Sequence, residues 1–426
     1  MSDVAVIGAG VAGIQAALDI AAHGVHVHLI EREPSIGGHM SQLDKTFPTN
    51  DCSMCILSPK MVDAARHPNI TLHTLTEVES IEGEVGNFTV HLLRHPRFVD
   101  ENTCNGCGDC TDVCPVEVYN RYEAGLGVRK AIYKPHPQVV PNVTIRDAEH
   151  CIDCGLCYDV CGRNAVLREE EEKHFSVHVA SIVVATGYDL FNACGKAQLA
   201  YLRVPDVITS LEFERMICAS GPTGGKLRCL SDGRTPESVI FIQCVGSRDM
   251  KLGRPYCSCV CCMYAIKNAI LIKEENPETK VTICYMDIRA YGKGYEEYYN
   301  RAEELGIRFL RGIPGEVLAS GGGIEIHVED TTTGAFESLH PDLVILSVGM
   351  EPATDSDKLA EKLNIPREES GFFQPADQKM GPVTTIKPGI YIAGAANAPK
   401  DIPDSVIQGQ AAAMRAFTDA MRTEKR

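Results

Sequence analysis

The chain has 426 residues, a formal net charge of −16 and 19 cysteines. This length allows roughly two to four domains, and the negative charge argues against nucleic acid or an anionic membrane surface as a partner. No apolar run approaches the ~18 residues needed for a direct membrane span, and the first residues show no export signal. We therefore expect a cytoplasmic protein whose cysteines are mostly metal ligands.

Residues 4–31 have the pattern of a strand, a tight turn, a helix and a second strand. The turn reads G-x-G-x-x-G, with Gly8, Gly10 and Gly13. In this motif the first glycine permits the turn, the second lets backbone approach a pyrophosphate, and the third lets the helix pack on the strand. The second strand ends at Glu31, whose carboxylate could accept hydrogen bonds from an adenosine ribose. A glycine-rich turn without a ligand is the alternative, but the spacing of strand, helix and acid favours a dinucleotide site.

The next segment contains a glycine pair and a cysteine pair. Gly37 and Gly38 stand where flavoproteins with two dinucleotide folds place a glycine pair beside the cofactor, which favours FAD over NAD. Cys52 and Cys55 lie where glutathione-reductase-like enzymes carry a redox-active pair, which could exchange electrons with a flavin. Two buried cysteines, or a packing role at a helix start, explain the pair equally well.

Two runs of the form C-x2-C-x2-C-x3-C follow. This spacing wraps three thiolates round one [4Fe-4S] cluster and gives the fourth thiolate to the other cluster. The expected ligands are Cys104, Cys107, Cys110 and Cys161 for one cluster, and Cys151, Cys154, Cys157 and Cys114 for the other. Structural zinc is disfavoured, because it usually pairs two C-x2-C knuckles and has no use for a third thiolate at the next step. The long connector at about 119–150 is expected to wrap the module or to dock it on a neighbour.

After the cysteine module the chain returns to a flavin-type pattern. The charged run 169–173 is most simply a solvated face, and residues 180–187 read as a strand ending in Ala-Thr-Gly at Gly187. The module is therefore predicted to be an insertion into one flavin-binding domain. Near the C-terminus, residues 389–396 resemble the last flavin-binding strand, with Gly394 at its end. Flavoproteins of this type place Asp after that glycine, so Ala395 removes a ribityl contact. The helix at about 404–421 should direct its N-terminal amides at the isoalloxazine.

The second half of the chain has a Rossmann-like scaffold without a nicotinamide motif. The strand 238–243 is followed by Cys244-Val245-Gly246, which supplies one of the three motif glycines. Without the others, backbone cannot approach a pyrophosphate in the usual way. A helix is expected over residues 295–305, and further strands over 281–286 and 342–349.

Thiols replace the missing motif. They are Cys244, Cys257, Cys259, Cys261 and Cys262, five within 19 positions, and a helix with apolar residues at Ile266, Ala269 and Ile270 follows them. The adjacent thiols of Cys261 and Cys262 can both be ligands only if a metal lies over the helix N-terminus, where the helix dipole favours thiolate. The pattern leaves open which of Cys244, Cys257 and Cys259 completes the set. Merely buried cysteines are the poorer explanation.

Taken together, these segments resemble the A subunit of heterodisulfide reductase. The shared stretches are the glycine motif, residues 51–60, the inserted cysteine module, and residues 243–249, 261–269 and 285–297. In that family Cys244, Cys257, Cys261 and Cys262 match ligands of an additional [4Fe-4S] cluster, which leaves Cys259 free. Lys267 matches a family lysine near the flavin and is the candidate catalytic residue. Its charge could stabilise a reduced flavin. A solvated helix residue is the alternative for Lys267.

The resemblance implies an FAD and iron–sulfur oxidoreductase subunit with three [4Fe-4S] clusters. Expected partners are other subunits of an electron-transfer complex, such as the B and C subunits of heterodisulfide reductase, linked to a hydrogenase or a dehydrogenase. Ferredoxin is a further candidate partner, and a homodimer within the larger complex is expected. The flavin could bifurcate electrons toward a disulfide of the CoB–CoM type and toward ferredoxin. The chain is also similar to the A subunit of the quinone-interacting oxidoreductase of sulfate reducers, so a quinone-linked role is the alternative. A stand-alone NAD(P)H-dependent disulfide reductase using Cys52 and Cys55 is the rival from another class.

The predicted fold class is α/β, a thioredoxin-reductase-like flavoprotein with two dinucleotide-binding domains and an inserted two-cluster ferredoxin module. The expected boundaries are 1–98, 167–235 and 351–426 for the FAD-binding domain, 99–166 for the module, and 236–350 for the degenerate second domain with its additional cluster site.

Overall fold

The computed structural model describes residues 2–423, which form two compact units. Unit 1 contains the described parts of Met1–Ser41, Met54–Tyr188 and Pro352–Arg426, and unit 2 contains Gln42–Ser53 and Asp189–Glu351. The chain passes between them near β13 (Tyr188–Leu190) and β22 (Met350–Pro352), which pair with each other. This division differs from the expected boundaries, because residues 42–53 and 189–235 belong to unit 2.

The main sheet of unit 1 has the order β5-β2-β1-β12-β7-β6, and β23 also pairs with β12. Its strands are β1 (Asp3–Ile7), β2 (Val27–Ile30), β5 (Ile70–His73), β6 (Thr76–Glu84), β7 (Asn87–Arg94), β12 (Lys173–Val184) and β23 (Ile390–Ile392). The β1–β2, β2–β5, β1–β12 and β12–β23 pairs are parallel, whereas β7 is antiparallel to β12 and β6. A parallel sheet of this kind is expected to have both faces covered.

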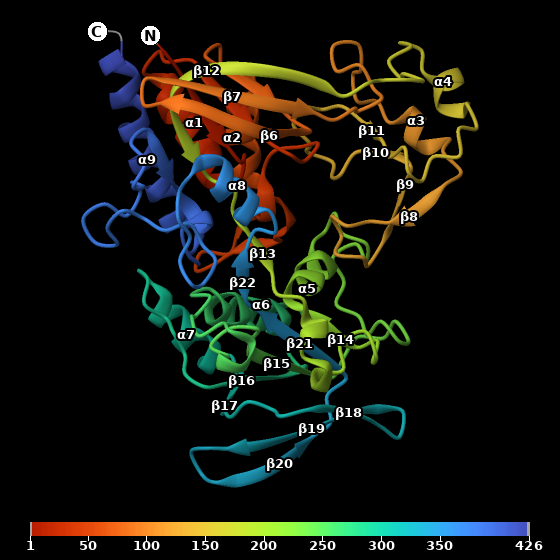
Figure 1. Ribbon diagram of the computed structural model, residues 1–426. Helices are drawn as coiled ribbons and strands as arrows, with labels where there is room; N and C mark the ends of the chain where they lie inside the picture. Colours follow the sequence, from red (N-terminus) through yellow and green to blue (C-terminus); the bar gives the residue numbers. More distant parts are fainter. Residues whose placement is uncertain (1, 424–426) are drawn as a thin grey trace. The chain divides into compact units, whose positions relative to one another are not determined.

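Alternate residues of these strands enter two separate cores. Val4, Val6 and Leu29 pack with the helices α1 (Val11–Ala22), α2 (Ser53–Arg66) and α9 (Ile402–Thr423). Ala5, Ile7 and Ile30 point to the other face, which packs with α8 (Ser356–Leu363). Helices α1 and α9 lie side by side in Figure 1, and they cross closely because Gly409 has no side chain. A Cβ at Gly409 would lie 2.5 Å from the carbonyl oxygen of Ala12.

The cysteine module leaves the sheet after β7 and returns to it at β12, as the orange and yellow segments of Figure 1 show. Its elements are α3 (Asp109–Asp112), β8 (Glu117–Tyr119), β9 (Val128–Lys130), β10 (Ile132–Tyr133), β11 (Ile145–Arg146) and α4 (Leu156–Val160). The two ends of the module meet in a bridge between Val99 and Val166. Its connector docks on unit 1, because Val140 is buried in the core beside Ile36 and its N–H donates to Ser35 Oγ at 3.0 Å.

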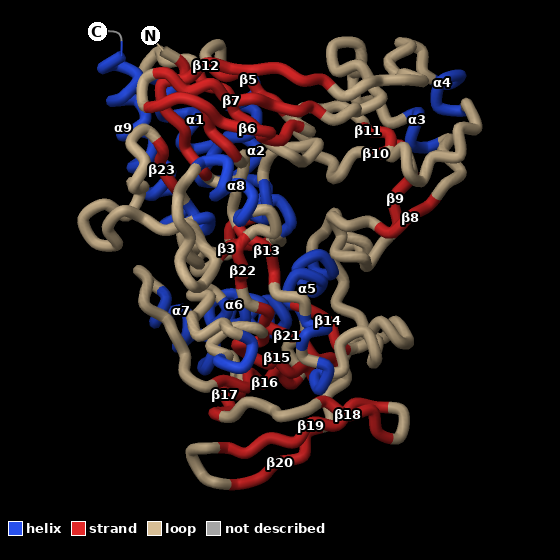
Figure 2. The backbone as a smooth tube through the Cα atoms, in the orientation of Figure 1, coloured by secondary structure: helices blue, strands red, loops and turns tan. Residues whose placement is uncertain are grey.

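Unit 2 contains a parallel sheet of order β14-β21-β15-β16-β17 and an antiparallel sheet of order β18-β19-β20 (Figure 2). The strands are β14 (Val207–Thr209), β15 (Ser238–Val245), β16 (Lys280–Tyr285), β17 (Arg308–Arg311), β18 (Val317–Ser320), β19 (Gly323–Asp330), β20 (Ala335–Leu339) and β21 (Leu343–Val348). The helices are α5 (Ser210–Ile217), α6 (Cys261–Glu275) and α7 (Tyr295–Glu304), and a short hairpin joins β3 (Lys45–Thr46) to β4 (Asp51–Cys52).

Both units thus have the parallel α/β organisation that the hydrophobic patterns predict. The expected helix over 295–305 and the strands over 281–286 and 342–349 correspond to α7, β16 and β21 within one residue at each end. None of the helices in residues 2–423 combines the length and apolar character needed to cross a bilayer.

Candidate functional site

The glycine motif forms the turn between β1 and α1. Gly8 has a φ of +97°, and a Cβ there would lie 2.4 Å from the carbonyl oxygen of Ala185. A Cβ at Gly13 would lie 1.9 Å from the carbonyl oxygen of Gly8, so this glycine allows α1 to pack on the turn. At Gly10, by contrast, a Cβ would meet no atom within 4 Å. The middle glycine therefore leaves space where the motif brings a pyrophosphate against backbone.

The other predicted flavin contacts surround this turn. Glu31 lies beyond β2, and its carboxylate accepts hydrogen bonds from the N–H of Ala9 at 2.8 Å and the N–H of Glu33 at 3.0 Å. Burial raises the pKa of Glu31, although both hydrogen bonds oppose the shift. Each carboxylate oxygen can accept a second hydrogen bond, so Glu31 both braces the turn and can receive a ribose hydroxyl.

Two further glycine segments lie close to the start of α1, and a third follows β12. The N–H of Gly37 donates to the carbonyl oxygen of Ala9 at 2.8 Å, and a Cβ at Gly38 would lie 3.1 Å from Gly10 Cα. A Cβ at Gly394 would lie 2.8 Å from Ala12 Cβ. Gly187 follows β12 with a φ of +73°.

Thr186, beside Gly187, has a buried hydroxyl oxygen without a hydrogen-bond partner among the described atoms. An unpaired hydroxyl of this kind is usually the partner of a ligand or a water molecule. The open space at Gly10 and the Thr186 hydroxyl fit a bound dinucleotide cofactor.

The two cysteine runs of the module adopt the same local structure. In each run the N–H two residues after the first cysteine donates to that cysteine's sulfur at 3.4 Å, from Gly106 to Cys104 and from Asp153 to Cys151. A glycine in the left-handed region, Gly108 or Gly155, then begins the short helix. Amide donors of this kind stabilise thiolate sulfur, which is the form that binds iron.

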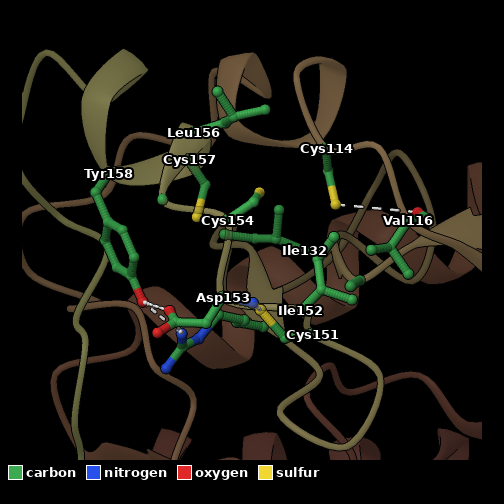
Figure 3. Close-up of a pocket in the computed structure, with 13 residues that line it drawn as sticks. Cys114, Val116, Ile132, Cys151, Ile152, Asp153, Cys154, Leu156, Cys157 and Tyr158 are labelled. Atoms are coloured by element: carbon green, nitrogen blue, oxygen red, sulfur yellow. Dashed lines mark hydrogen bonds and ion pairs between the residues drawn. The ribbon is translucent and has the colours of Figure 1, made fainter.

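One set of four thiols lines a hollow that is open in part to solvent. Figure 3 shows that Cys114 comes from the first run, whereas Cys151, Cys154 and Cys157 come from the second. The hollow also has apolar walls, among them Ile132. Sequence spacing predicts this crossing of the fourth thiol from one run to the other.

The other set lies near the bridge between Val99 and Val166, where the two ends of the module meet. The Cys104 and Cys161 side chains pack with buried Cys110 around Val99 and Ala165, in a cluster that Cys114 and Cys157 of the first set also contact. Burial raises the pKa of Cys110, and the nearby thiols of Cys104 and Cys107 raise it further. The N–H of Ala165 donates to Cys161 Sγ at 3.3 Å. The four residues expected to bind the first cluster therefore come from both ends of the module.

A third group of thiols lies in unit 2, at the carboxyl end of β15 and the start of α6. Cys244, Cys261 and Cys262 are buried, and Cys257 is half-buried. Burial raises the pKa of Cys261, as do the neighbouring thiols of Cys244, Cys262 and Cys257. These residues thus form one mutually interacting set. The Cys259 thiol donates to the backbone carbonyl of Cys257 at 3.5 Å and also interacts with the Cys257 thiol.

Two arginines lie beside this third group. The Arg248 guanidinium binds both carboxylate oxygens of Asp287, at 2.7 and 2.9 Å, and it also hydrogen-bonds the Cys244 thiol. Arg289 interacts electrostatically with Cys257. Positive charge and N–H donors next to sulfur favour thiolate and raise the reduction potential of a cluster bound there. The donor set fits an iron–sulfur cluster better than thiols that merely fill a core.

Gly246, directly after β15, does not provide an open phosphate loop. A Cβ at Gly246 would lie 2.0 Å from Phe191 Cγ, because the buried Phe191 ring lies directly over this glycine. The glycine is required for aromatic packing at the position where a second dinucleotide motif would approach its ligand.

Lys267 is buried on α6, with 1% of its surface exposed, so it is not a solvated helix residue. Its amine donates to the Glu214 carboxylate and to the Lys45 carbonyl oxygen. The other oxygen of Glu214 accepts the N–H of Asp44 at 3.1 Å. This ion pair joins α5 and α6 to the segment Gln42–Ser53 within unit 2.

Cys52 and Cys55 are disulfide-bonded, whereas the other cysteines are free. Cys55 is exposed at the start of α2. The interpretation of the pair as two buried cysteines is therefore wrong, and a redox role for the pair stays a prediction.

Comparisons with known proteins agree with the cofactors that this geometry suggests. Residues 3–53 match the sequence model of the FAD dependent oxidoreductase family, and residues 103–166 match that of the 4Fe-4S dicluster domain. The matched regions are the glycine turn and the cysteine module. FAD and 4Fe-4S clusters are the cofactors that these two families describe.

Close relatives cover almost the whole chain. It is 54% identical over 416 residues to the iron–sulfur A subunit, form 2, of CoB–CoM heterodisulfide reductase from Methanopyrus kandleri, and the match covers 97% of this chain and 63% of that protein. It is 49% identical over 421 residues to the A subunit of the H2:CoB–CoM heterodisulfide, ferredoxin reductase from Methanothermobacter thermautotrophicus, covering 98% and 64%. This chain is a homologue of the heterodisulfide reductase A subunit. It spans somewhat less than two thirds of the length of these relatives.

Solved structures show the fold. Thioredoxin reductase from T. acidophilum matches with a TM-score of 0.54 at 15% identity, covering 99% of each chain. Lactococcus lactis thioredoxin reductase matches with a TM-score of 0.54 at 16% identity, covering 99% of this chain and 100% of that one. The predicted thioredoxin-reductase-like fold class is confirmed, together with the resemblance to the heterodisulfide reductase A subunit.

Several residues of the site were not predicted from the sequence. Glu214 lies 53 residues from Lys267, and Phe191 lies 55 residues before Gly246, so no local pattern connects either pair. Arg248 and Asp287 lie in stretches shared with the family, but their pairing depends on the packing of β15 and β16. The assignment of each thiol and glycine to a cofactor stays a prediction.

Proposed function

We propose that this chain is the FAD and iron–sulfur subunit of an electron-transfer complex of the heterodisulfide reductase type. The observation that carries the proposal is the convergence of Cys114 with Cys151, Cys154 and Cys157 around one hollow of the module, supported by the interacting thiols at the carboxyl end of β15. When bound, FAD exchanges electrons in pairs and iron–sulfur clusters exchange them singly. The residues around Gly10 would hold FAD, and the thiol groups would hold the iron–sulfur clusters.

The packing of Phe191 on Gly246 supports electron entry through partner proteins rather than through a nicotinamide. The ring occupies the space above the one glycine that remains of a second dinucleotide motif. A pyrophosphate could reach this backbone only if the buried ring moved. The stand-alone NAD(P)H-dependent reductase is therefore the weaker candidate.

The names of the relatives support a proposal for the acceptor and the partners. The relative from Methanothermobacter thermautotrophicus is named as a reductase of both heterodisulfide and ferredoxin. By homology we propose that this chain works with partners like the B and C subunits of heterodisulfide reductase, as a homodimer within a larger complex. Electrons would divide at the flavin between a disulfide and ferredoxin. A hydrogenase or dehydrogenase would supply them, and a quinone-linked acceptor is the alternative.

Iron content and redox titration test the proposal. The anaerobically purified chain should contain one FAD and about twelve iron atoms, as three [4Fe-4S] clusters require. Cys257→Ser should remove the EPR signal of one cluster, whereas the matched variant Cys259→Ser should retain every signal, because the family resemblance leaves Cys259 outside the ligand set.

Two outcomes would contradict the proposal. Equal loss of iron in Cys257→Ser and Cys259→Ser would show that the proposed third cluster does not have the predicted ligands. Rapid bleaching of the flavin by NADPH in the pure chain would establish the nicotinamide-dependent alternative. The isolated chain should instead be reduced by dithionite and show no fast reaction with NADPH.

A second role is favoured for the oxidised pair. Cys52 and Cys55 are disulfide-bonded, and Cys55 is an exposed residue. A thiolate that attacks a disulfide sulfur opens the bond through a mixed disulfide. We propose thiol–disulfide exchange at this pair. Cys55→Ser should abolish reduction of a small aromatic disulfide by the dithionite-reduced chain, with Cys194→Ser, another exposed cysteine, as the control. Equal rates in the two variants would show that the pair takes no part in exchange.

A further inference from the structure

A group of histidines lies on the main sheet of unit 1, separate from the glycine turn. His28 on β2 is paired in register with Ala5 on β1 and with Thr71 on β5. Because side chains alternate along a strand, Asp3 and His26 share the face of His28 and Ala5. His73 shares it too, two residues beyond Thr71. This is the face whose other positions, such as Ile30, enter an apolar core.

The donor atoms of three of these residues converge. Asp3 Oδ2 lies 3.1 Å from His28 Nε2, and one donor atom from each of Asp3, His26 and His28 lies within 4.8 Å of the other two. Nitrogen and oxygen ligands held 2.0–2.1 Å from a tetrahedral zinc ion are about 3.4 Å apart. Small rotations of the imidazoles would therefore bring all three donors to one ion. The Asp3 side chain is 33% exposed and that of His28 14% exposed, so solvent reaches the group.

A second layer of hydrogen bonds orients the imidazoles. His28 Nδ1 lies 3.1 Å from His73 Nε2, and His26 Nε2 lies 2.9 Å from Thr71 Oγ1. The rings of His28 and His73 are stacked with their centroids 5.4 Å apart. In metal sites the ring nitrogen that does not bind the ion usually makes such a bond, which fixes the tautomer and the ring orientation. His73 is placed to do this for His28.

We propose that Asp3, His26 and His28 form a binding site for a divalent ion of the zinc class, with water in the remaining position. Two imidazoles and a carboxylate suit Zn²⁺, Co²⁺ or Ni²⁺, whereas Mg²⁺ and Ca²⁺ prefer oxygen ligands alone. The site joins β1 to β2 near the amino end of the sheet. Gly8 follows the opposite end of β1, about 16 Å away at 3.3 Å per residue. The ion would thus brace the two strands that carry the glycine turn and Glu31.

Equilibrium dialysis of the anaerobic holoprotein against Co²⁺, with metals counted by mass spectrometry, tests the site. The native chain should retain one Co²⁺ more than the His28→Gln variant at the same free concentration. The matched control is His91→Gln on β7, whose imidazole is bonded to Ser176 instead and which should bind Co²⁺ like the native chain. His73→Gln should weaken binding roughly 10- to 100-fold, as loss of an outer hydrogen bond does in other metal sites.

Ligand identity and folding are checked on the same samples. X-ray absorption at the cobalt edge should show nitrogen and oxygen neighbours for the ion that distinguishes the native chain from His28→Gln. Unchanged FAD and iron contents show that a variant is folded, and Asp3→Asn, at a partly exposed position, replaces His28→Gln if that variant does not fold. Equal Co²⁺ retention by the native chain and the folded variant, or sulfur neighbours for this ion, would show that the group is only a hydrogen-bonded cluster and overturn the proposal.

Discussion

The substitution Lys267→Met probes the buried ion pair that joins α6 to the segment Gln42–Ser53. The Lys267 amine donates to Glu214 and to the Lys45 carbonyl oxygen, and Glu214 in turn accepts the N–H of Asp44. The two charged side chains are 1% and 4% exposed. Methionine matches the length of the lysine stem but leaves the Glu214 carboxylate buried without its counter-charge.

The expected loss is large for one substitution. Removing one partner of a buried pair typically costs ~3–5 kcal/mol, because the remaining charge stays desolvated. Since ~1.4 kcal/mol corresponds to a factor of ten, the amides of residues 44–50 should exchange hydrogen roughly a hundredfold faster or more. Native-state hydrogen exchange read by mass spectrometry measures this opening directly. Adding Glu214→Gln to Lys267→Met should recover most of the protection, because no unpaired charge then remains.

Lys273→Met is the control on the same helix. Lys273 bonds the carbonyl oxygens of Pro277 and Thr279 near the end of α6, and its replacement should leave residues 44–50 unchanged. Exchange in Lys267→Met within about threefold of the native rate, equivalent to less than ~1 kcal/mol, would refute the argument. So would a double variant that exchanges as fast as Lys267→Met alone.

Three other variants test the cofactor sites. Gly10→Ala should fold normally but lose FAD, since a Cβ there meets no atom within 4 Å. Gly13→Ala should instead destabilise unit 1 itself, since its Cβ would lie 1.9 Å from the Gly8 carbonyl oxygen. Thermal melting with flavin fluorescence separates the two effects, and full FAD content in Gly10→Ala would show that the pyrophosphate does not bind at that position. Arg248→Gln should lower the midpoint potential of the third cluster by about 60 mV, equivalent to ~1.4 kcal/mol for one electron, because a positive N–H donor to Cys244 is lost. An EPR redox titration measures the potential, and a value unchanged from the native chain would place Arg248 outside the influence of the cluster.

Motifs with a fixed local geometry were predictable from the sequence. The glycine turn joins two elements adjacent in the chain, so its spacing alone places Gly8, Gly10 and Gly13. The exchange of Cys114 and Cys161 between the two runs also follows from spacing, because each fourth cysteine is carried away from its own loop by a short helix. The degenerate second motif was visible in the same way, as the loss of two glycines after β15.

Positions that depend on distant partners were not predictable. Residues 42–53 belong to unit 2 because Lys267, Glu214 and Tyr298 bind them, and these residues lie far away in the sequence. A helical lysine with no visible partner looks like a solvated side chain. Likewise, only the packing of Phe191 shows why Gly246 remains when its neighbouring motif glycines are absent.

The sequence by itself determined the α/β class, the dinucleotide turn and the two interleaved cysteine runs, because periodicity and spacing act over a few turns of chain. Tertiary structure alone decided which of the two units contains Gln42–Ser53, which side chain neutralises Lys267, and how Asp3, His26 and His28 come together. Those relations join neighbouring strands or separate helices. Sheet register and side-chain packing fix them, and neither is written in any single segment.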